Sequence, residues 1–263
     1  VARCRGGDPD PALALALARS GHRLARAARL PWPPVEAPRP APDRRLRIGR
    51  AGSLPGGRPA WRTPGGEALG VEAAAIAYLR LAGREALHAE NWLWSSLFAL
   101  VFRELYWLPV PGRLPTARRS GPVDLGTPAF YAARQAAAGQ ALARLEAEGL
   151  GPFADTFSGE IVAGLSRVET AIQVGRRLPG KMLSTVLYEL LRRGFAAASG
   201  LPDVLVLPGA VVHAPHFFPS TMPETAFLAE VKGPGDSLRE GQRVWIDRLI
   251  ATKIHVELWT VSE

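Results

Sequence analysis

The sequence predicts an α/β protein in which a mixed β-sheet is flanked by helices. Three apolar segments with strand character occur at residues 203–207, 226–232 and 256–259, and we expect these strands to be adjacent. Apolar residues at helical spacing fill residues 181–195 and 238–249. Hydrophobic residues make up 47% of the 263 residues, which is enough to build a sizeable core.

The composition restricts the class of protein. The single cysteine, Cys4, rules out an internal disulfide framework and fits a reducing compartment. No apolar run approaches 18 residues, and the first residues lack the pattern of a signal peptide. We therefore expect a cytoplasmic protein with no membrane contact.

Positive charge is concentrated at the start of the chain. The net charge is +8, and residues 1–50 contain eleven arginines against four acidic residues. A basic segment beside a nearly neutral domain is typical of a polyanion-binding edge. The alternative is an arginine-rich composition with a solvated tail.

The sequence up to residue 67 predicts a short N-terminal helix and a linker, which precede the main domain. Residues 9–30 favour a helix rich in Ala, Leu and Arg, and residues 31–43 contain six prolines, which indicates an extended linker. A short strand is expected from Arg44 to Ile48. The Gly- and Pro-rich residues 49–67 are expected to form a loop.

Helices are expected over most of residues 70–195. The pattern predicts a helix at residues 70–82, and a long apolar helix from Trp92 to Trp107 with Glu90 at its start. An acid in a first turn is ordinarily a favourable partner for the helix dipole. Pro128 is expected to begin an Ala-rich helix that runs to about Glu148.

Further helical pieces are expected at residues 152–178, before the amphipathic helix at residues 181–195. Arg192 and Arg193 lie near the end of that last helix. These two residues could contact phosphate groups, or they could simply interact with the helix dipole, and the sequence does not favour either role.

The segment around Glu230 and Lys232 carries the strongest chemical signal. In a strand both side chains project from one face, with Val231 on the other, and Gly233-Pro234-Gly235 then ends the strand. Alone, the pair could be a surface ion pair. The chain has 29 arginines and only three lysines, however, so Lys232 suggests a need for a compact, titratable ammonium group.

A second carboxylate is expected beside Glu230. Asp203 follows a Gly-Leu-Pro turn and opens an apolar strand, which a hairpin or neighbouring pair would bring next to the strand of Glu230. Two adjacent carboxylates repel unless a cation lies between them, and Mg²⁺ favours such all-oxygen sites. Alone, Asp203 could simply cap the turn.

Gln242 lies inside the apolar stripe of the last helix. A buried amide must be hydrogen-bonded, so we expect Gln242 to point at the two acidic strands. Ser237 with Glu240 is typical of a capping box at the start of this helix, although Asp236 could be the cap instead.

These motifs together resemble a known family. Gly-Leu-Pro-Asp203, Glu230-Val-Lys232-Gly-Pro-Gly-Asp236, Gln242, Trp245 and a closing Val256-Glu-Leu-Trp resemble the VRR-type nuclease domain. Within that group they are most similar to the Fanconi-associated nucleases, of the restriction-endonuclease-like PD-(D/E)xK superfamily. The resemblance spans roughly residues 60–263. It departs at Ala196–Ser199, where family members usually carry a basic residue.

The resemblance implies a domain organisation. Residues 1–48 would be a remnant of a helical-repeat domain with its linker. Residues 49–263 would be the nuclease domain, with a helical insertion at about residues 126–180.

The resemblance also implies the roles of the site residues. Glu90, Asp203, Glu230 and the Val231 carbonyl would hold Mg²⁺ or Mn²⁺. Lys232 would position or deprotonate the attacking water, and Gln242 would orient Lys232 or the water. Arg192 and Arg193 are candidate nucleic-acid contacts.

The implied function is a metal-dependent, structure-specific DNA nuclease, with 5′ flap endonuclease and 5′-to-3′ exonuclease activity in interstrand-crosslink repair. We expect branched or flapped DNA as the partner, a monomer, and a cytoplasmic protein associated with the nucleoid through DNA. The alternatives are a dimeric four-way-junction resolvase and a catalytically inactive DNA-binding module.

Overall fold

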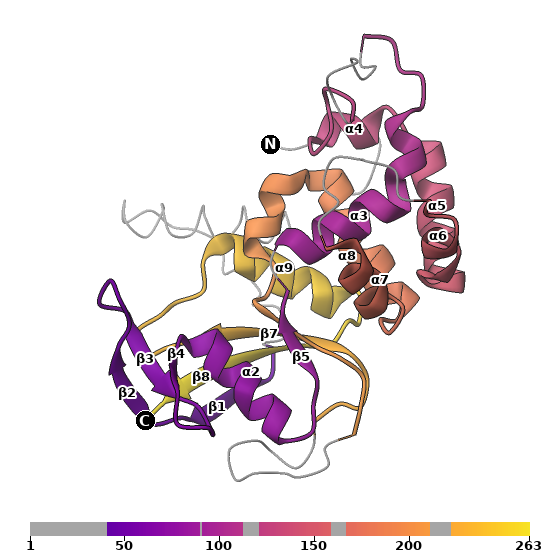
Figure 1. Cartoon of the computed structure of the whole chain (residues 1–263). Coiled ribbons are helices and arrows are strands. Elements are labelled where there is room, and N and C mark those ends of the chain that lie inside the picture. Colours follow the sequence, from indigo (N-terminus) through magenta and orange to yellow (C-terminus); the bar gives the residue numbers. More distant parts are fainter. Residues whose placement is uncertain (1–40, 90, 113–120, 159–166, 211–221) are drawn as a thin grey trace, which may run out of the picture.

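A five-stranded mixed sheet lies at the centre of the computed structural model, which describes residues 41–89, 91–112, 121–158, 167–210 and 222–263. The strand order is β1-β8-β7-β6-β5. Figure 1 shows this sheet with helices on both of its faces. The strands are β1 (Asp43–Arg47), β5 (Ala86–His88), β6 (Val204–Val206), β7 (Phe227–Lys232) and β8 (Val256–Ser262).

The pairing confirms the predicted adjacency of the three C-terminal strands. β6 and β7 are antiparallel, with Val204 opposite Ala229, whereas β7 and β8 are parallel, with Ala229 opposite Glu257. β1 adds in parallel to β8, and β5 adds antiparallel to β6. The predicted α/β class with a mixed sheet is therefore confirmed.

The central strands are apolar on both faces because helices cover both faces. Leu205 and Leu228 face a core formed with the helices α3 (Asn91–Tyr106), α8 (Gly180–Arg193) and α9 (Glu240–Ala251). On the opposite face, Phe227 and Ala229 pack with α2 (Val71–Leu81). Successive strand residues thus alternate between two cores.

The remaining helices lie together on the α3 and α8 side of the molecule (Figure 1). They are α4 (Pro128–Ala132), α5 (Gln135–Glu148), α6 (Gly151–Asp155) and α7 (Val168–Gly175), and a 3₁₀ helix η1 (Phe195–Gly200) follows α8. The prediction of one helix from Pro128 to Glu148 was wrong, since the chain breaks at Ala133–Arg134. There the buried Arg134 guanidinium donates to the Leu105 and Phe130 carbonyls and to Asp124.

Residues 49–67 form a second sheet and not the predicted loop. Its strands, in the order β2-β3-β4, are β2 (Arg50–Ser53), β3 (Pro59–Arg62) and β4 (Ala68–Leu69). Most of the Gly and Pro residues that suggested a loop lie in the turns, although Gly52 is in β2 and Pro59 is in β3. In Leu54-Pro55-Gly56-Gly57, the Gly57 N–H donates to the Leu54 carbonyl and Gly56 has φ +88°, a type II turn with Pro and Gly at its two central positions.

Strand β5 was not predicted, because it has only three residues and directly precedes the apolar pattern of helix α3. His88 pairs with Val204, and the helix begins at Asn91. The predicted helix at residues 9–30 and the linker up to residue 40 lie outside the described residues. No helix in the described part of the chain is long and apolar enough to cross a membrane.

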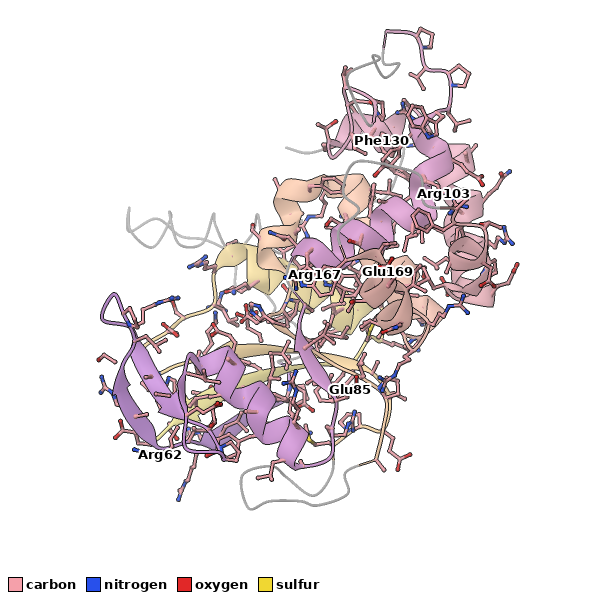
Figure 2. The ribbon with its side chains drawn as sticks, viewed as in Figure 1. Arg62, Glu85, Arg103, Phe130, Arg167 and Glu169 are labelled. Atoms are coloured by element: carbon pink, nitrogen blue, oxygen red, sulfur yellow. The ribbon has the colours of Figure 1, made fainter. Side chains whose placement is uncertain are left out.

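Buried arginines join neighbouring elements through backbone carbonyls. Arg84, which is 1% exposed, donates to the carbonyls of Pro223 and Leu207 at 2.6 and 2.8 Å. Arg103 in α3 donates to the Phe153 and Thr156 carbonyls beyond the end of α5. Figure 2 shows Arg103 among the helices and Arg62 at the end of β3 in the small sheet. High arginine content therefore serves packing as well as surface charge.

Candidate active site

The pairing of β6 with β7 brings Asp203 beside Glu230, as predicted. Asp203 directly precedes β6, and its Oδ2 lies 3.4 Å from the backbone nitrogen of Val231. The Val231 side chain is buried on the opposite face, in the core with α2. Two carboxylates therefore converge where β7 ends.

Lys232 lies on the same face as Glu230 and closes the site. Its Nζ is 2.6 Å from Glu230 Oε1, and its side chain is 15% exposed whereas that of Glu230 is fully buried. The ammonium group is thus at the solvent-accessible mouth of the site. The alternation of a strand explains why Glu-x-Lys, with one residue between, forms this contact.

Gln242 is held by three hydrogen bonds that fix the orientation of its amide. Its Nε2 donates to Glu230 Oε1 at 2.5 Å, and its Oε1 accepts from Lys232 Nζ at 3.2 Å and from the Arg239 backbone N–H at 2.9 Å. The predicted direction of Gln242, towards the acidic strands, agrees with this geometry. The amide joins the helix to both charged residues of β7.

The predicted caps of α9 were wrong. The helix begins at Glu240, and the capping contact is made by Gln242 with the Arg239 backbone. Asp236 instead accepts from the Gly233 N–H at 3.0 Å, which closes the turn after β7. Arg239 is thus the N-cap residue of α9, and the Gln242 side chain satisfies its backbone N–H.

The Glu230 carboxylate binds a proton more tightly than an ordinary glutamate does. Burial first, and the charge of Asp203 second, raise its pKa from 4.5 to about 8, although the hydrogen bond and charge of Lys232 oppose the shift. Two carboxylates in one buried site cannot both ionise easily without a compensating cation. Such perturbed groups are typical of functional sites.

Gly200 explains the glycine of the Gly-Leu-Pro-Asp motif. A Cβ atom at Gly200 would lie 2.6 Å from the Gly241 carbonyl oxygen and 3.0 Å from the Trp245 ring. The Trp245 indole N–H also donates to the Ala197 carbonyl at 2.7 Å. The glycine therefore allows η1 to contact the start of α9, which carries Gln242.

The residues at the site fit a hard divalent cation. Glu230 Oε2 is buried and has no hydrogen-bond partner among the described residues, and its neighbour is the carboxylate of Asp203. Carboxylate oxygens are the donors that Mg²⁺ and Mn²⁺ prefer. Within the described ranges no group of three or more His, Cys, Asp or Glu residues gathers as a metal site.

The third predicted acid, Glu90, lies outside the described residues. Its neighbour Ala89 donates its backbone N–H to the Asp203 carbonyl at 2.9 Å, next to the pairing of His88 with Val204. The roles of Glu90 and of the Val231 carbonyl as ligands stay predictions.

Arg192 and Arg193 are engaged within the protein. Arg192 donates to the buried Glu189 at 2.9 Å, and Glu189 is also paired with Arg248 of α9 at 2.8 Å. The guanidinium of Arg193 lies over the Trp245 ring, 5.5 Å from its centroid. Both side chains are half-buried. Their role in binding nucleic acid stays a prediction, and any such contact would have to compete with these interactions.

The segment that carries the site matches a known protein family. The family model of the VRR-NUC domain matches residues 160–263, which contain Asp203, Glu230, Lys232 and Gln242. Residues 160–263 match the VRR-NUC domain. The resemblance noted from the motifs is therefore confirmed over this part of the chain.

Fanconi-associated nucleases are among the curated proteins to which this chain is similar. The Fanconi-associated nuclease 1 homolog of Schizosaccharomyces pombe is 27% identical over 214 residues, which cover 78% of this chain and 29% of the relative. Fanconi-associated nuclease 1 of Ailuropoda melanoleuca is 29% identical over 205 residues, or 72% of this chain and 18% of the relative. The chain thus spans less than a third of the length of these relatives.

Solved structures show the same fold. A crystal structure of paFAN1 bound to 1-nt 5′ flap DNA with a gap matches with a TM-score of 0.67 at 23% sequence identity, covering 97% of this chain and 44% of that one. The complex of paFAN1 with 2-nt 5′ flap DNA matches with a TM-score of 0.64 at 24% identity. The likeness shows that the mixed sheet and its helices share the fold of paFAN1.

Proposed function

We propose that this chain is a metal-dependent DNA nuclease that hydrolyses phosphodiester bonds at branched or flapped DNA. The observation that carries the proposal is the convergence of Asp203, Glu230, Lys232 and Gln242 at one end of β7, with a buried Glu230 oxygen left without a partner among the described residues. The VRR-NUC match and the Fanconi-associated relatives support it.

Asp203 and Glu230 would hold the cation, with Glu90 and the Val231 carbonyl completing the ligands. A bound Mg²⁺ or Mn²⁺ would neutralise charge on the phosphate and activate the attacking water. Both carboxylates must be ionised for this, so the raised pKa of Glu230 makes metal binding compete with a proton.

Lys232 would act on the water and on the phosphate. Its ammonium group is at the mouth of the site, beside Glu230 Oε1, where it can donate to the attacking water or to a non-bridging phosphate oxygen. Its positive charge would stabilise the negative charge that develops in the transition state.

Gln242 would position the two charged residues and not react itself. Its amide nitrogen donates a hydrogen bond to Glu230 and its amide oxygen accepts one from Lys232. These two hydrogen bonds hold the carboxylate and the ammonium group in fixed positions relative to each other. The Arg239 backbone fixes the amide in turn. Orientation by such supporting contacts is a common requirement of metal-assisted sites.

The solved paFAN1 structures support flapped DNA as the substrate. The paFAN1 complexes contain 5′ flap DNA, so a 5′ flap is the first substrate to test. We further propose 5′-to-3′ exonuclease activity and a role in interstrand-crosslink repair, in line with the names of the relatives.

A cleavage panel tests the proposal. Purified protein would be incubated with 5′ flap, 3′ flap, four-way-junction and single-stranded DNA, each with Mg²⁺, Mn²⁺ or EDTA. We expect cleavage of the 5′ flap in both metals and none in EDTA. Preferential cutting of the four-way junction by a dimer would favour a resolvase, and DNA binding without cleavage would favour an inactive binding module.

A further inference from the structure

One exposed arginine beside the candidate site has no role in the chemistry described so far. Arg239 is the N-cap residue of α9, and its side chain is exposed. It forms no ion pair with any residue in the described part of the chain. Arg192 and Arg248, by contrast, share the buried carboxylate of Glu189. The Arg239 guanidinium is therefore available to a ligand.

Arg239 is linked to Lys232 through a single atom. Gln242 Oε1 accepts from the Arg239 backbone N–H at 2.9 Å and from Lys232 Nζ at 3.2 Å. The Arg239 backbone nitrogen and the Lys232 ammonium nitrogen therefore cannot be farther apart than these two lengths combined. Because the two residues meet at this oxygen in space, and not only along the chain, Arg239 lies beside the candidate site.

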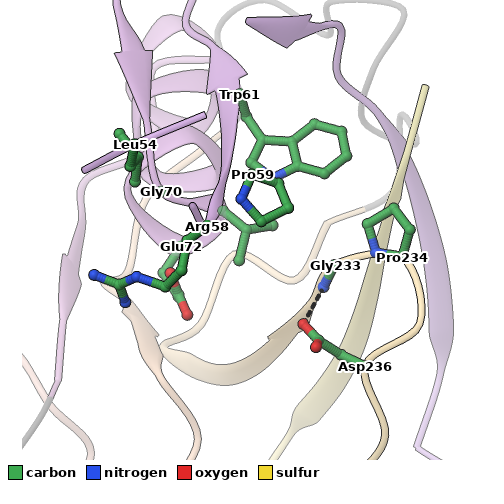
Figure 3. Close-up of a pocket in the computed structure, with 10 residues that line it drawn as sticks. Leu54, Arg58, Pro59, Trp61, Gly70, Glu72, Gly233, Pro234 and Asp236 are labelled. Carbon is green, nitrogen blue, oxygen red and sulfur yellow. Dashed lines mark hydrogen bonds between the residues drawn. The ribbon is translucent and has the colours of Figure 1, made fainter. Parts of the chain in front are cut away.

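The link between β7 and α9 holds Arg239 from its other side. In this link the Gly233 N–H donates to Asp236 Oδ2 at 3.0 Å (Figure 3). The Asp236 N–H donates to the Gly233 carbonyl at 3.2 Å, and Leu238 packs against the core on the α9 side of the sheet. The position of Arg239 relative to the site is thus fixed by the folded link as well as by the Gln242 amide.

Arg239 and Lys232 are on the same side of the sheet. Lys232 projects from the face of β7 that α9 covers, whereas Val231 packs in the core with α2 on the opposite face. The Lys232 side chain is 15% exposed, so solvent reaches the site at this point. A DNA strand that approaches the ammonium group from solvent therefore meets the exposed start of α9, where Arg239 lies.

The chemistry of a guanidinium group suits a phosphate. Its N–H donors lie in one plane and can bond two phosphate oxygens at once, and it stays charged at physiological pH. Successive phosphates of one DNA strand are about 3.4 Å apart along the helix axis. When one phosphate is held at Lys232, a neighbouring phosphate is therefore within reach of an arginine side chain that starts at Arg239.

We propose that Arg239 binds a phosphate adjacent to the scissile phosphate in the strand that is cut. The inference rests on the proposed nuclease function and adds a residue that positions the substrate. A second anchored phosphate fixes the direction in which the strand crosses the site, because a single contact leaves the scissile phosphate free to rotate. The backbone of Arg239 orients Gln242, and its side chain holds the DNA.

A scan with neutral phosphates tests this inference. A series of 5′ flap substrates would each carry one methylphosphonate, which lacks the negative charge, at a position within two nucleotides of the scissile bond. Single-turnover cleavage rates would be measured at enzyme concentrations that saturate the DNA. We expect the wild type to cut one substrate, neutralised next to the scissile bond, about tenfold more slowly than the intact flap, since a charge-assisted hydrogen bond is lost.

The variant Arg239→Ala then connects this position to the arginine. It keeps the backbone N–H that bonds Gln242, so the arrangement of Lys232 and Gln242 is retained. We expect it to cut the intact flap about tenfold more slowly than the wild type, with no further loss when the sensitive phosphate is neutralised. The other positions of the scan should affect the variant and the wild type equally.

The matched control is Arg62→Ala. Arg62 is also exposed and forms no ion pair within the described ranges, but it lies in the small sheet, which packs with α2 on the opposite face of the main sheet (Figure 2). This variant should keep the wild-type rate on the intact flap and the wild-type loss at the sensitive position.

Failure of this inference is distinguishable from failure of the proposed function. If no position of the scan slows the wild type, or if Arg239→Ala keeps the full loss at the sensitive position, the inference is overturned and the nuclease function stands. If the wild type cuts no DNA at all, the proposed function is overturned, and this inference with it.

Discussion

Glu230 is the residue whose environment best explains the site. It is fully buried, with Asp203 beside it and with Lys232 and Gln242 both on its Oε1. This arrangement stabilises the pair of carboxylates only in part, since Glu230 Oε2 has no donor in the described chain. A cation would relieve the repulsion between the two carboxylates, whereas a proton does so in its absence.

The pKa of Glu230 predicts how stability changes with pH in metal-free buffer. Because the folded pKa of about 8 exceeds the ordinary value of 4.5, the folded state keeps a proton that the unfolded chain releases. The wild type should therefore lose free energy of unfolding as pH rises from about 4.5 to about 8, by up to about 5 kcal/mol. Urea unfolding in EDTA at several pH values measures this.

Glu230→Gln supplies the comparison. Its amide does not titrate, so the stability of the variant relative to the wild type should increase over the same pH range and level off above it. A constant difference between the two proteins across this pH range would show that Glu230 titrates normally.

Two substitutions at Gln242 separate its role in orienting Glu230 and Lys232 from the effect of adding a charge at this position. Gln242→Ala removes the contacts with Glu230 and Lys232, and we expect about a 10- to 100-fold slower cleavage with little change in DNA affinity, as is common for supporting residues of metal sites. Gln242→Glu adds a third carboxylate and should require a higher metal concentration for half-maximal rate. Equal metal requirements in Gln242→Glu and the wild type would argue against this placement.

At the scale of elements, buried arginines fix connections that the sequence motifs do not reveal. Arg84 follows α2 and donates to the carbonyls of Leu207 and Pro223, on the two sides of the link between β6 and β7. It also lies 5.8 Å from the centroid of the Phe227 ring. One guanidinium therefore holds both strands of the acidic pair in place.

Removing this guanidinium should destabilise the protein. Arg84→Met leaves buried carbonyls without donors, at a cost of about 3 kcal/mol in the free energy of unfolding. Arg80→Met is the control, because Arg80 is an exposed arginine of α2 whose bond to the Ala86 carbonyl is 3.4 Å long. Thermal or urea unfolding that gives equal losses of stability for both variants would contradict the role of Arg84.

Elements with a clear apolar pattern could be predicted, whereas short elements without one could not. Helices α2, α3 and α8 and strands β6 and β7 carry apolar patterns that are fixed by burial on one or two faces. The small sheet was not predicted because its strands have four, four and two residues and its turns supply most of the Gly and Pro.

The site itself was more predictable than its surroundings. The positions of Asp203, Glu230, Lys232 and Gln242 follow from strand alternation and from one polar residue in an apolar stripe. The pairing of Arg192 with Glu189 and the contact of Arg193 with Trp245 were not predicted, because they need the packing of α8 on α9.

For the whole molecule, the structure divides the arginines into structural and exposed sets. Arg44 of the basic N-terminal segment pairs with the buried Glu257 on β8, with an Nη2–Oε1 distance of 2.7 Å. Three other arginines of that segment are exposed and have no ion pair or side-chain hydrogen bond in the described part of the chain. They are Arg45, Arg47 and Arg50.

These exposed arginines should contribute to DNA affinity through counterion release. The triple variant Arg45→Ala, Arg47→Ala, Arg50→Ala should lower the slope of log K against log salt by about one unit for each phosphate that is no longer neutralised. The matched control removes three arginines that pair with acids near the helical side, Arg144, Arg176 and Arg177, and should change the slope less. Equal slopes for the two triple variants would assign no special role to the β1–β2 edge.

The central claim is that Asp203 and Glu230 hold a catalytic cation for phosphodiester hydrolysis. The most direct test is the single-turnover rate of 5′ flap cleavage by Asp203→Asn in Mg²⁺, measured at enzyme concentrations that saturate the DNA. The substitution keeps the shape of the side chain and removes one ligand charge. We predict that cleavage falls by at least about 1,000-fold while DNA binding persists, since loss of metal-based stabilisation costs several kcal/mol in the barrier. Cleavage by Asp203→Asn at the wild-type rate would contradict the account.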